Sequence, residues 1–170
     1  MQNRIKNLES RILGVDPGYG RVGFAVIEIE NGQQKLLHSE CFETDKNLSH
    51  PERLGLIAER LKEVLEKFQP TKMAVEELLF SKNVKTAIKV AEARGVILAE
   101  SAKQKIPVFE YNPNSVKLAV TGYGKSDKKQ IINMLERILH IKTKIKFDDE
   151  YDAIAVALTC AVSAYPQLSP

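Results

Sequence analysis

A short segment near the N-terminus places two apolar runs around a cluster of glycines and one proline. The segment covers residues 12–26 and reads ILGVDPGYGRVGFAV. Apolar and β-branched runs on both sides of such a cluster predict a strand, a tight turn and a second strand. Asp16 ends the first run, where an aspartate is unfavourable unless it is paired or bound to a cation. Because glycines let a ligand approach the backbone, the segment indicates either a ligand site at Asp16 or a turn that Asp16 merely caps.

The rest of the chain alternates between helical and strand patterns. Asn31-Gly32 is a strong hairpin signal, so residues 34–42 are predicted to add a third antiparallel strand. Apolar spacing and capping signals then predict helices over 50–69, 83–104, 113–121, 127–140 and 149–164, and strands over 72–77 and 106–111. We therefore expect an α/β fold, with a mixed five-stranded sheet (first three strands antiparallel) and helices on both faces.

Length and composition set only broad limits. The 170 residues are enough for one domain with a sizeable core, and the net charge is only +3. We expect residues 1–10 to form a polar, mobile N-terminal extension and residues 11–170 to form the single domain. No apolar run resembles a membrane span or a signal peptide, so we expect a cytoplasmic protein without membrane contact. Cys41 and Cys160 lack nearby Cys or His partners, and both are predicted to be buried thiols.

Four acidic residues stand where predicted elements begin or end. Asp16 and Glu76 end predicted strands, whereas Asp149 and Asp152 lie one turn apart on the last helix. Four converging carboxylates would repel one another strongly unless cations lay between them. Oxygen ligands of this kind suit Mg²⁺ or Mn²⁺, and paired divalent ions serve displacement at a phosphodiester.

Two features of this acidic set have alternative interpretations. Glu77 is as good a candidate as Glu76, because neighbouring strand residues face opposite sides of a sheet. Residues 148–150 are all acidic and could instead be an N-terminal charge cluster that the helix dipole favours.

Basic residues are concentrated in the C-terminal half. Between residues 117 and 146 they outnumber acids by eight to two, and the eight are Lys117, Lys125, Lys128, Lys129, Arg137, Lys142, Lys144 and Lys146. Such a concentration is typical of phosphate neutralisation. For residues 142–146, a solvated charged face is an equally good interpretation.

The motifs occur in an order that resembles a known family. GVDPGYGRVGFAV, AVEELLFSKN, ARGV, FEYNPNSVK, GYGKSDK and DEYDAIAVAL follow one another as in the RuvC family of bacterial Holliday junction resolvases. The resemblance covers residues 11–165. It implies an RNase H-like nuclease domain, a homodimer, and metal-dependent nicking of two opposed strands at a four-way DNA junction in recombination and repair. The expected products carry 5′-phosphate and 3′-hydroxyl ends.

The resemblance also implies roles for individual residues. The family's metal-binding catalytic acids match Asp16, Glu76, Asp149 and Asp152, which selects Glu76 over Glu77. Two Mg²⁺ ions per active site are expected, with Mn²⁺ as a substitute. The family's basic residues near the scissile phosphate match Lys117 and Lys128, and a branch-migration motor complex of the RuvA and RuvB type is the expected further partner.

One position departs from the family pattern. The family commonly carries an aromatic residue three positions after the strand-ending glutamate, and this chain has Leu79 there and Phe80 next. We expect Leu79, Phe80 and Lys82 to contact DNA at the crossover, with the aromatic role passing to Phe80. The glycine-flanked Lys125 is expected to contact DNA as well.

Small residues line one side of the helix predicted over residues 83–104. Ala87, Ala91 and Gly95 are four residues apart and share a face, which allows close approach of another helix. We expect this face to form the dimer interface. The alternative is that it packs on the sheet of its own chain.

Two other functional classes fit the sequence less well than a nuclease. An ATPase of the actin and Hsp70 type also has an acid and glycines after its first strand, but it needs a second lobe and a second phosphate loop. A junction-binding protein without catalysis would not need all four acids. The sequence therefore favours the nuclease.

Overall fold

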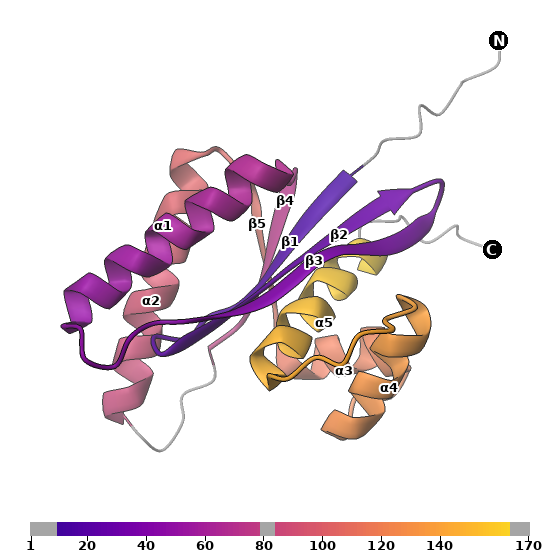
Figure 1. Ribbon diagram of the computed structural model, residues 1–170. Coiled ribbons are helices and arrows are strands. Elements are labelled where there is room, and N and C mark those ends of the chain that lie inside the picture. Colours follow the sequence, from indigo (N-terminus) through magenta and orange to yellow (C-terminus); the bar gives the residue numbers. More distant parts are fainter. Residues whose placement is uncertain (1–9, 79–83, 164–170) are drawn as a thin grey trace, which may run out of the picture.

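A computed structural model describes residues 10–78 and 84–163 of the chain (Figure 1). Its five strands form one sheet in the order β3-β2-β1-β4-β5. The antiparallel strands are β1 (Ser10–Asp16), β2 (Arg21–Glu30) and β3 (Gln33–Glu43), and β4 (Lys72–Glu76) and β5 (Val108–Tyr111) continue the sheet parallel to β1. The predicted mixed sheet with an antiparallel meander is thus confirmed.

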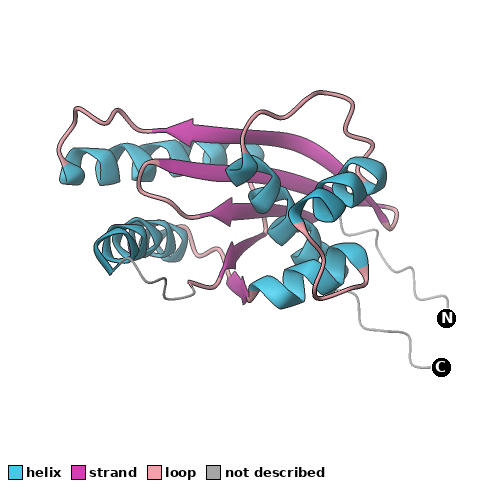
Figure 2. Cartoon of the chain, turned by 90° about the horizontal axis from the view of Figure 1, so that it is seen from below, coloured by secondary structure: helices cyan, strands magenta, loops and turns pink. Residues whose placement is uncertain are grey.

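Helices cover both faces of this sheet (Figure 2). On one face, α1 (His50–Phe68) and α2 (Val84–Lys103) pack over a core that includes Phe24, Leu61 and Ile97. On the other face lie α3 (Pro113–Thr121), α4 (Lys128–Ile138) and α5 (Asp148–Ser163). No helix in the described part of the chain is long and apolar enough to cross a bilayer.

Two strand glycines allow α5 to lie directly against the sheet. A Cβ atom on Gly14 would collide with the carbonyl of Ala153, and one on Gly23 would collide with the carbonyl of Asp149. All of Ala153–Ala161 is buried, and every residue of this stretch except Thr159 is apolar. This close approach places the N-terminal turns of α5 beside the end of β1, where Asp16 lies.

Capping chemistry explains several element boundaries. Ser49 and Glu52 form a capping box at the start of α1, and the helix ends at Gln69, which takes a left-handed conformation before Pro70. The N-cap of α4 is Asp127, which exchanges hydrogen bonds with Gln130. Ser126 instead bonds to Thr121 and to the carbonyl of Tyr123.

Three expectations need adjustment. Strand β5 begins at Val108 rather than at residue 106, because Lys105 takes a positive φ and the amide of Ile106 still bonds back to Ser101 of α2. Ser10, assigned to the N-terminal extension, already pairs with Ile29 in β1; residues 1–9 lie outside the described part. Cys160 is buried as predicted, but Cys41 is only partly buried, since its strand β3 is at the edge of the sheet.

Candidate active site

Two parallel neighbouring strands end in acidic residues at the same edge of the sheet. Val15 of β1 pairs with Val75 of β4, so Asp16 and Glu76 follow at adjacent strand ends. Glu76 lines a pocket at this edge, whereas the neighbouring Glu77 is exposed. Of the two glutamates left open by the strand pattern, Glu76 is therefore the one that faces the candidate site.

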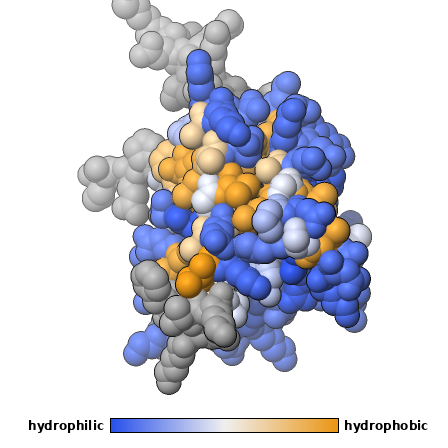
Figure 3. Space-filling model, turned by 90° about the vertical axis from the view of Figure 1, so that its left-hand side faces the viewer, coloured by the Kyte–Doolittle hydropathy of each residue, from blue (hydrophilic) through white to orange (hydrophobic). Residues whose placement is uncertain are grey.

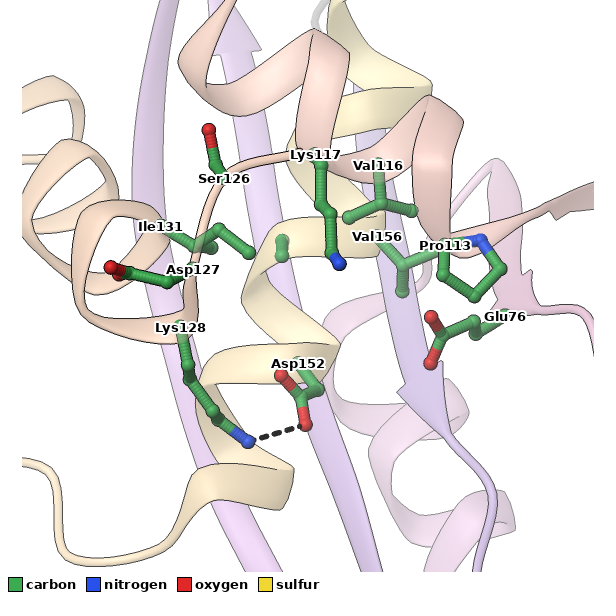
Figure 4. Close-up of a pocket in the computed structure, with 11 residues that line it drawn as sticks. Glu76, Pro113, Val116, Lys117, Ser126, Asp127, Lys128, Ile131, Asp152 and Val156 are labelled. Carbon is green, nitrogen blue, oxygen red and sulfur yellow. Dashed lines mark hydrogen bonds and ion pairs between the residues drawn. The ribbon is translucent and has the colours of Figure 1, made fainter. Parts of the chain in front are cut away.

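The pocket lies between β4, α3, α4 and α5 and has a volume of about 290 Å³ (Figure 4). Asp152 enters it from α5, Lys117 from α3 and Lys128 from the first turn of α4. Its other lining residues are Pro113, Val116, Ser126, Asp127, Ile131, Ala155 and Val156. The lining is thus mixed, with apolar side chains between charged groups that come from four different elements.

Asp16 is the electrostatic centre of the acidic group. Burial and, after it, the nearby carboxylates of Asp152, Glu76 and Asp149 together raise its pKa from 3.8 to about 8, against the opposing charge of Lys128. Burial and Asp152 likewise raise the pKa of Glu76, while Lys128 and Lys117 lower it. The structure therefore brings together all four acids and both lysines that the sequence singled out.

Lys128 holds two acids of α5 at once. Its Nζ lies 3.0 Å from Oδ2 of Asp152 and 3.2 Å from Oδ2 of Asp148. Burial lowers the pKa of Lys128, but the hydrogen bonds to Asp152 and Asp148 outweigh it and raise the pKa overall. Asp148 belongs to the acidic cluster at the start of the last helix, and in the structure it forms an ion pair with Lys128.

Arg21 is a site residue that the sequence reasoning missed. Its Nε lies 3.2 Å from Oδ2 of Asp149, and its guanidinium lies 5.3 Å from the ring centroid of Phe147. The available signal was a basic residue five positions after Asp16, immediately past the glycine turn. The acid with which Arg21 pairs depends on how α5 packs across β2, and this packing cannot be read from a local sequence pattern.

The donor set fits a hard divalent cation, although its atoms are not yet arranged as a ligand cage. All four candidate ligands are carboxylates, the type that Mg²⁺ and Mn²⁺ prefer. Within residues 10–78 and 84–163, no three acidic, His or Cys side chains are grouped closely enough to hold a metal ion. Arg21 and Lys128 instead form ion pairs with Asp149 and Asp152.

The remaining candidate residues lie away from this pocket or outside the described part. Lys125 is exposed in the loop between α3 and α4 and does not line the pocket. Leu79, Phe80 and Lys82 lie outside the described residues. On α2, Ala87 is partly buried, and Ala91 and Gly95 are exposed. Among the side chains of α2 that the structure describes, those of Ala93, Ile97 and Ser101 are buried, so Ala91 and Gly95 lie on a different face from the one that packs on the chain's own sheet.

We expect Asp16→Asn to stabilise the metal-free protein, and to do so most at high pH. The unfolded carboxyl ionises near pH 3.8, whereas the folded one stays protonated up to about pH 8. Between these values the folded state binds the extra proton, so wild-type stability falls as pH rises. Asparagine carries no such group. The variant should therefore gain about 2 kcal/mol or more in free energy of unfolding at pH 8, and much less at pH 4.

Denaturant unfolding in EDTA at both pH values measures this difference. Glu77→Gln is the matched control, because Glu77 is exposed beside the site, and its effect should be small at either pH. Equal gains for Asp16→Asn at pH 4 and pH 8 would show that the Asp16 carboxyl is not held neutral by its surroundings.

Comparisons with known proteins give one consistent result. The family model described as "Crossover junction endodeoxyribonuclease RuvC" matches residues 12–160. A protein of that name from Thermotoga petrophila is 48% identical over 147 residues, which cover 86% of this chain and 89% of the relative. One from Brevibacillus brevis is 44% identical over 151 residues, covering 89% and 91%.

Solved structures agree with this result. The structure of T. thermophilus RuvC in complex with Holliday junction substrate superposes with a TM-score of 0.86 at 35% identity, covering 91% of this chain and 94% of that one. The yeast mitochondrial Holliday junction resolvase Ydc2 shares the fold, with a TM-score of 0.64 at 17% identity over 90% and 79% of the two chains.

Proposed function

This chain belongs to the RuvC family of crossover junction endodeoxyribonucleases, and we therefore propose that it resolves four-way (Holliday) DNA junctions by nicking two opposed strands. One observation indicates which residues form the active site. Carboxylates from the ends of two parallel strands and from one helix converge around Asp16, next to two lysines. Such a group is suited to binding cations and a phosphodiester together.

In this proposal, Asp16, Glu76, Asp149 and Asp152 are the catalytic groups and the ligands of two Mg²⁺ ions, for which Mn²⁺ can substitute. When bound, the metal supplies the positive charge that activates water for attack on phosphorus and stabilises the leaving 3′-oxygen. The products are then a 5′-phosphate and a 3′-hydroxyl. Asp16 is central, because each of the other three carboxylates acts on it electrostatically.

Lys117 and Lys128 are proposed to face the scissile phosphate. Both line the pocket that Glu76 and Asp152 share, so a phosphate entering there meets two cations and the ligand carboxylates. Lys128 would have to leave Asp152 and Asp148 to approach a phosphate, and a divalent cation on Asp152 would favour that exchange. Lys125, Lys82 and the Leu79-Phe80 pair are proposed as further DNA contacts, with Phe80 stacking at the crossover.

A homodimer is proposed because a four-way junction presents two equivalent strands. The exposed surface of α2 supports an interface there. Ala91 and Gly95 are exposed, Ile88 is 54% exposed, and a Cβ atom on Gly95 would meet nothing within 4 Å. Figure 3 shows apolar surface on this side of the molecule, bordered by hydrophilic surface. A two-fold dimer would present two active sites to opposed strands, and a RuvA- and RuvB-type motor is the proposed further partner.

Cleavage of a synthetic four-way junction, compared with a linear duplex of the same arm sequence, tests the function. We expect nicks at symmetric positions in two opposed strands with Mg²⁺, none with EDTA, and duplex cleavage slower by at least about a hundredfold. ATP hydrolysis should be absent. Equal cleavage of duplex and junction would contradict the proposal, as would junction binding without cleavage at any divalent metal concentration.

A further inference from the structure

Arg21 holds one of the four acids from outside the pocket. It is the first residue of β2, and its Nε lies 3.2 Å from Oδ2 of Asp149. The Asp149 side chain is 23% exposed, whereas that of Arg21 is 48% exposed. The guanidinium also lies 5.3 Å from the ring centroid of Phe147, immediately before α5. Arg21 therefore has two anchors but remains accessible from solvent.

The backbone brings this pair together. Gly23, two residues after Arg21, has no room for a Cβ atom because the carbonyl of Asp149 lies against it. The same glycine is the register partner of Asp16 in β1. The contact between Gly23 of β2 and Asp149 of α5 thus places Arg21, Asp149 and Asp16 near one another. All three residues belong to strands or a helix.

This arrangement creates competition for Asp149. A divalent cation bound by its carboxylate would have to share the oxygen with a guanidinium or displace it, and two positive charges at one carboxylate repel each other. Lys128 stands in the same relation to Asp152. Among the described residues, no ion pair engages Asp16 or Glu76. The two acids on α5, Asp149 and Asp152, are therefore each paired with a basic side chain, whereas the strand-ending acids Asp16 and Glu76 are not.

An accessible arginine at this position also suits a phosphate. Guanidinium groups bind phosphate oxygens in charge-assisted, often bidentate hydrogen bonds. The turn between β1 and β2 and the first turn of α5 lie at the same, lower end of the molecule in Figure 1. Arg21 therefore lies at the end of the molecule that also carries Asp16 and Asp149, where it is open to a phosphate from solvent.

We propose that Arg21 is a positioning residue that competes with the divalent cation for Asp149 and is transferred to a DNA phosphate when the junction binds. This inference rests on the proposed function. DNA binding then frees Asp149 and completes the metal site, so that the site forms on the substrate. By linkage, the metal and the DNA each strengthen binding of the other through this residue.

Arg21→Gln tests the proposal, because it should change two affinities in opposite directions. In DNA-free protein, Mn²⁺ binding measured by calorimetry should tighten about two- to fivefold, the scale of an exposed ion pair. In EDTA, where no cleavage occurs, junction binding should weaken, and the slope of log K against log salt should fall by about one. A purely structural role would weaken both affinities.

Two variants serve as controls. The Nζ atom of Lys146 lies 4.6 Å from the same Phe147 ring and has no ion pair among the described residues, so Lys146→Gln should leave Mn²⁺ affinity unchanged. Arg21→Lys keeps the charge and should restore both affinities toward wild type. If Arg21→Gln fails to fold, Arg21→Met is measured in its place.

The outcomes separate this inference from the proposed function. If wild-type protein binds neither Mn²⁺ nor a junction, the proposed function fails. If wild-type protein binds both, and loss of the arginine leaves Mn²⁺ affinity unchanged or weaker, the competition at Asp149 is overturned while the nuclease proposal stands. An unchanged salt slope overturns the transfer to phosphate.

Discussion

Asp16→Asn is expected to abolish junction cleavage while junction binding persists or tightens. A neutral amide is a poorer ligand for a hard cation, and Asp16 is the carboxylate on which the other three act. We expect the cleavage rate to fall by at least about a thousandfold, comparable to the loss of a key electrostatic contact in other enzymes. Binding should not suffer, because asparagine, like the metal-free Asp16 carboxyl below about pH 8, places no negative charge in the way of a phosphate.

Single-turnover cleavage of a labelled junction and a gel-shift titration in EDTA measure the two effects separately. Asp152→Asn and Glu76→Gln should behave in the same way. Glu77→Gln provides the matched control: it is the exposed sequence neighbour of Glu76 and should retain wild-type cleavage. Cleavage by Asp16→Asn within about tenfold of wild type would rule out its assignment as the central metal ligand.

Ala91→Glu is expected to convert the dimer into folded monomers. Ala91 is exposed in the single chain and lies one turn from Gly95 and from Ala87 on α2. At a two-fold interface the new carboxylate would meet, or lie near, its own copy in the partner, and buried like charges are strongly unfavourable. Paired nicking of opposed strands should then be lost.

Sedimentation velocity reports the oligomeric state, and circular dichroism reports whether the fold survives. Ala91→Ser has nearly the same size without a charge and should remain dimeric. If Ala91→Glu also remains dimeric, the interface lies elsewhere. If it unfolds, the face serves the monomer, contrary to the exposure of Ala91.

Much of the fold could be predicted from the sequence, because the informative signals are local. The hairpin turn at Asn31-Gly32, the capping box at Ser49 and the strand-ending acids each report on their own neighbourhood. Gly14 and Gly23 show the limit of such signals. They read as ordinary strand glycines, yet they allow the backbone of α5 to touch the sheet and so set the position of Asp149.

The parts that could not be predicted depend on contacts between distant segments. The partial exposure of Cys41 follows from the position of β3 at the sheet edge, which its alternating pattern does not specify. The choice between Glu76 and Glu77 required a resemblance, since strand periodicity left both open. The Arg21–Asp149 pair joins residues 128 positions apart in the numbering and has no local signature.

Anomalous diffraction from crystals grown with Mn²⁺ tests the central claim most directly. We expect anomalous density at the carboxylate of Asp16, with two ions about 4 Å apart and further ligands from Glu76, Asp149 and Asp152. The Mn²⁺ concentration should be one that supports junction cleavage in solution. Density only at other sites, or none within coordination distance of Asp16 at that concentration, would contradict the claim that these four acids form the catalytic metal site.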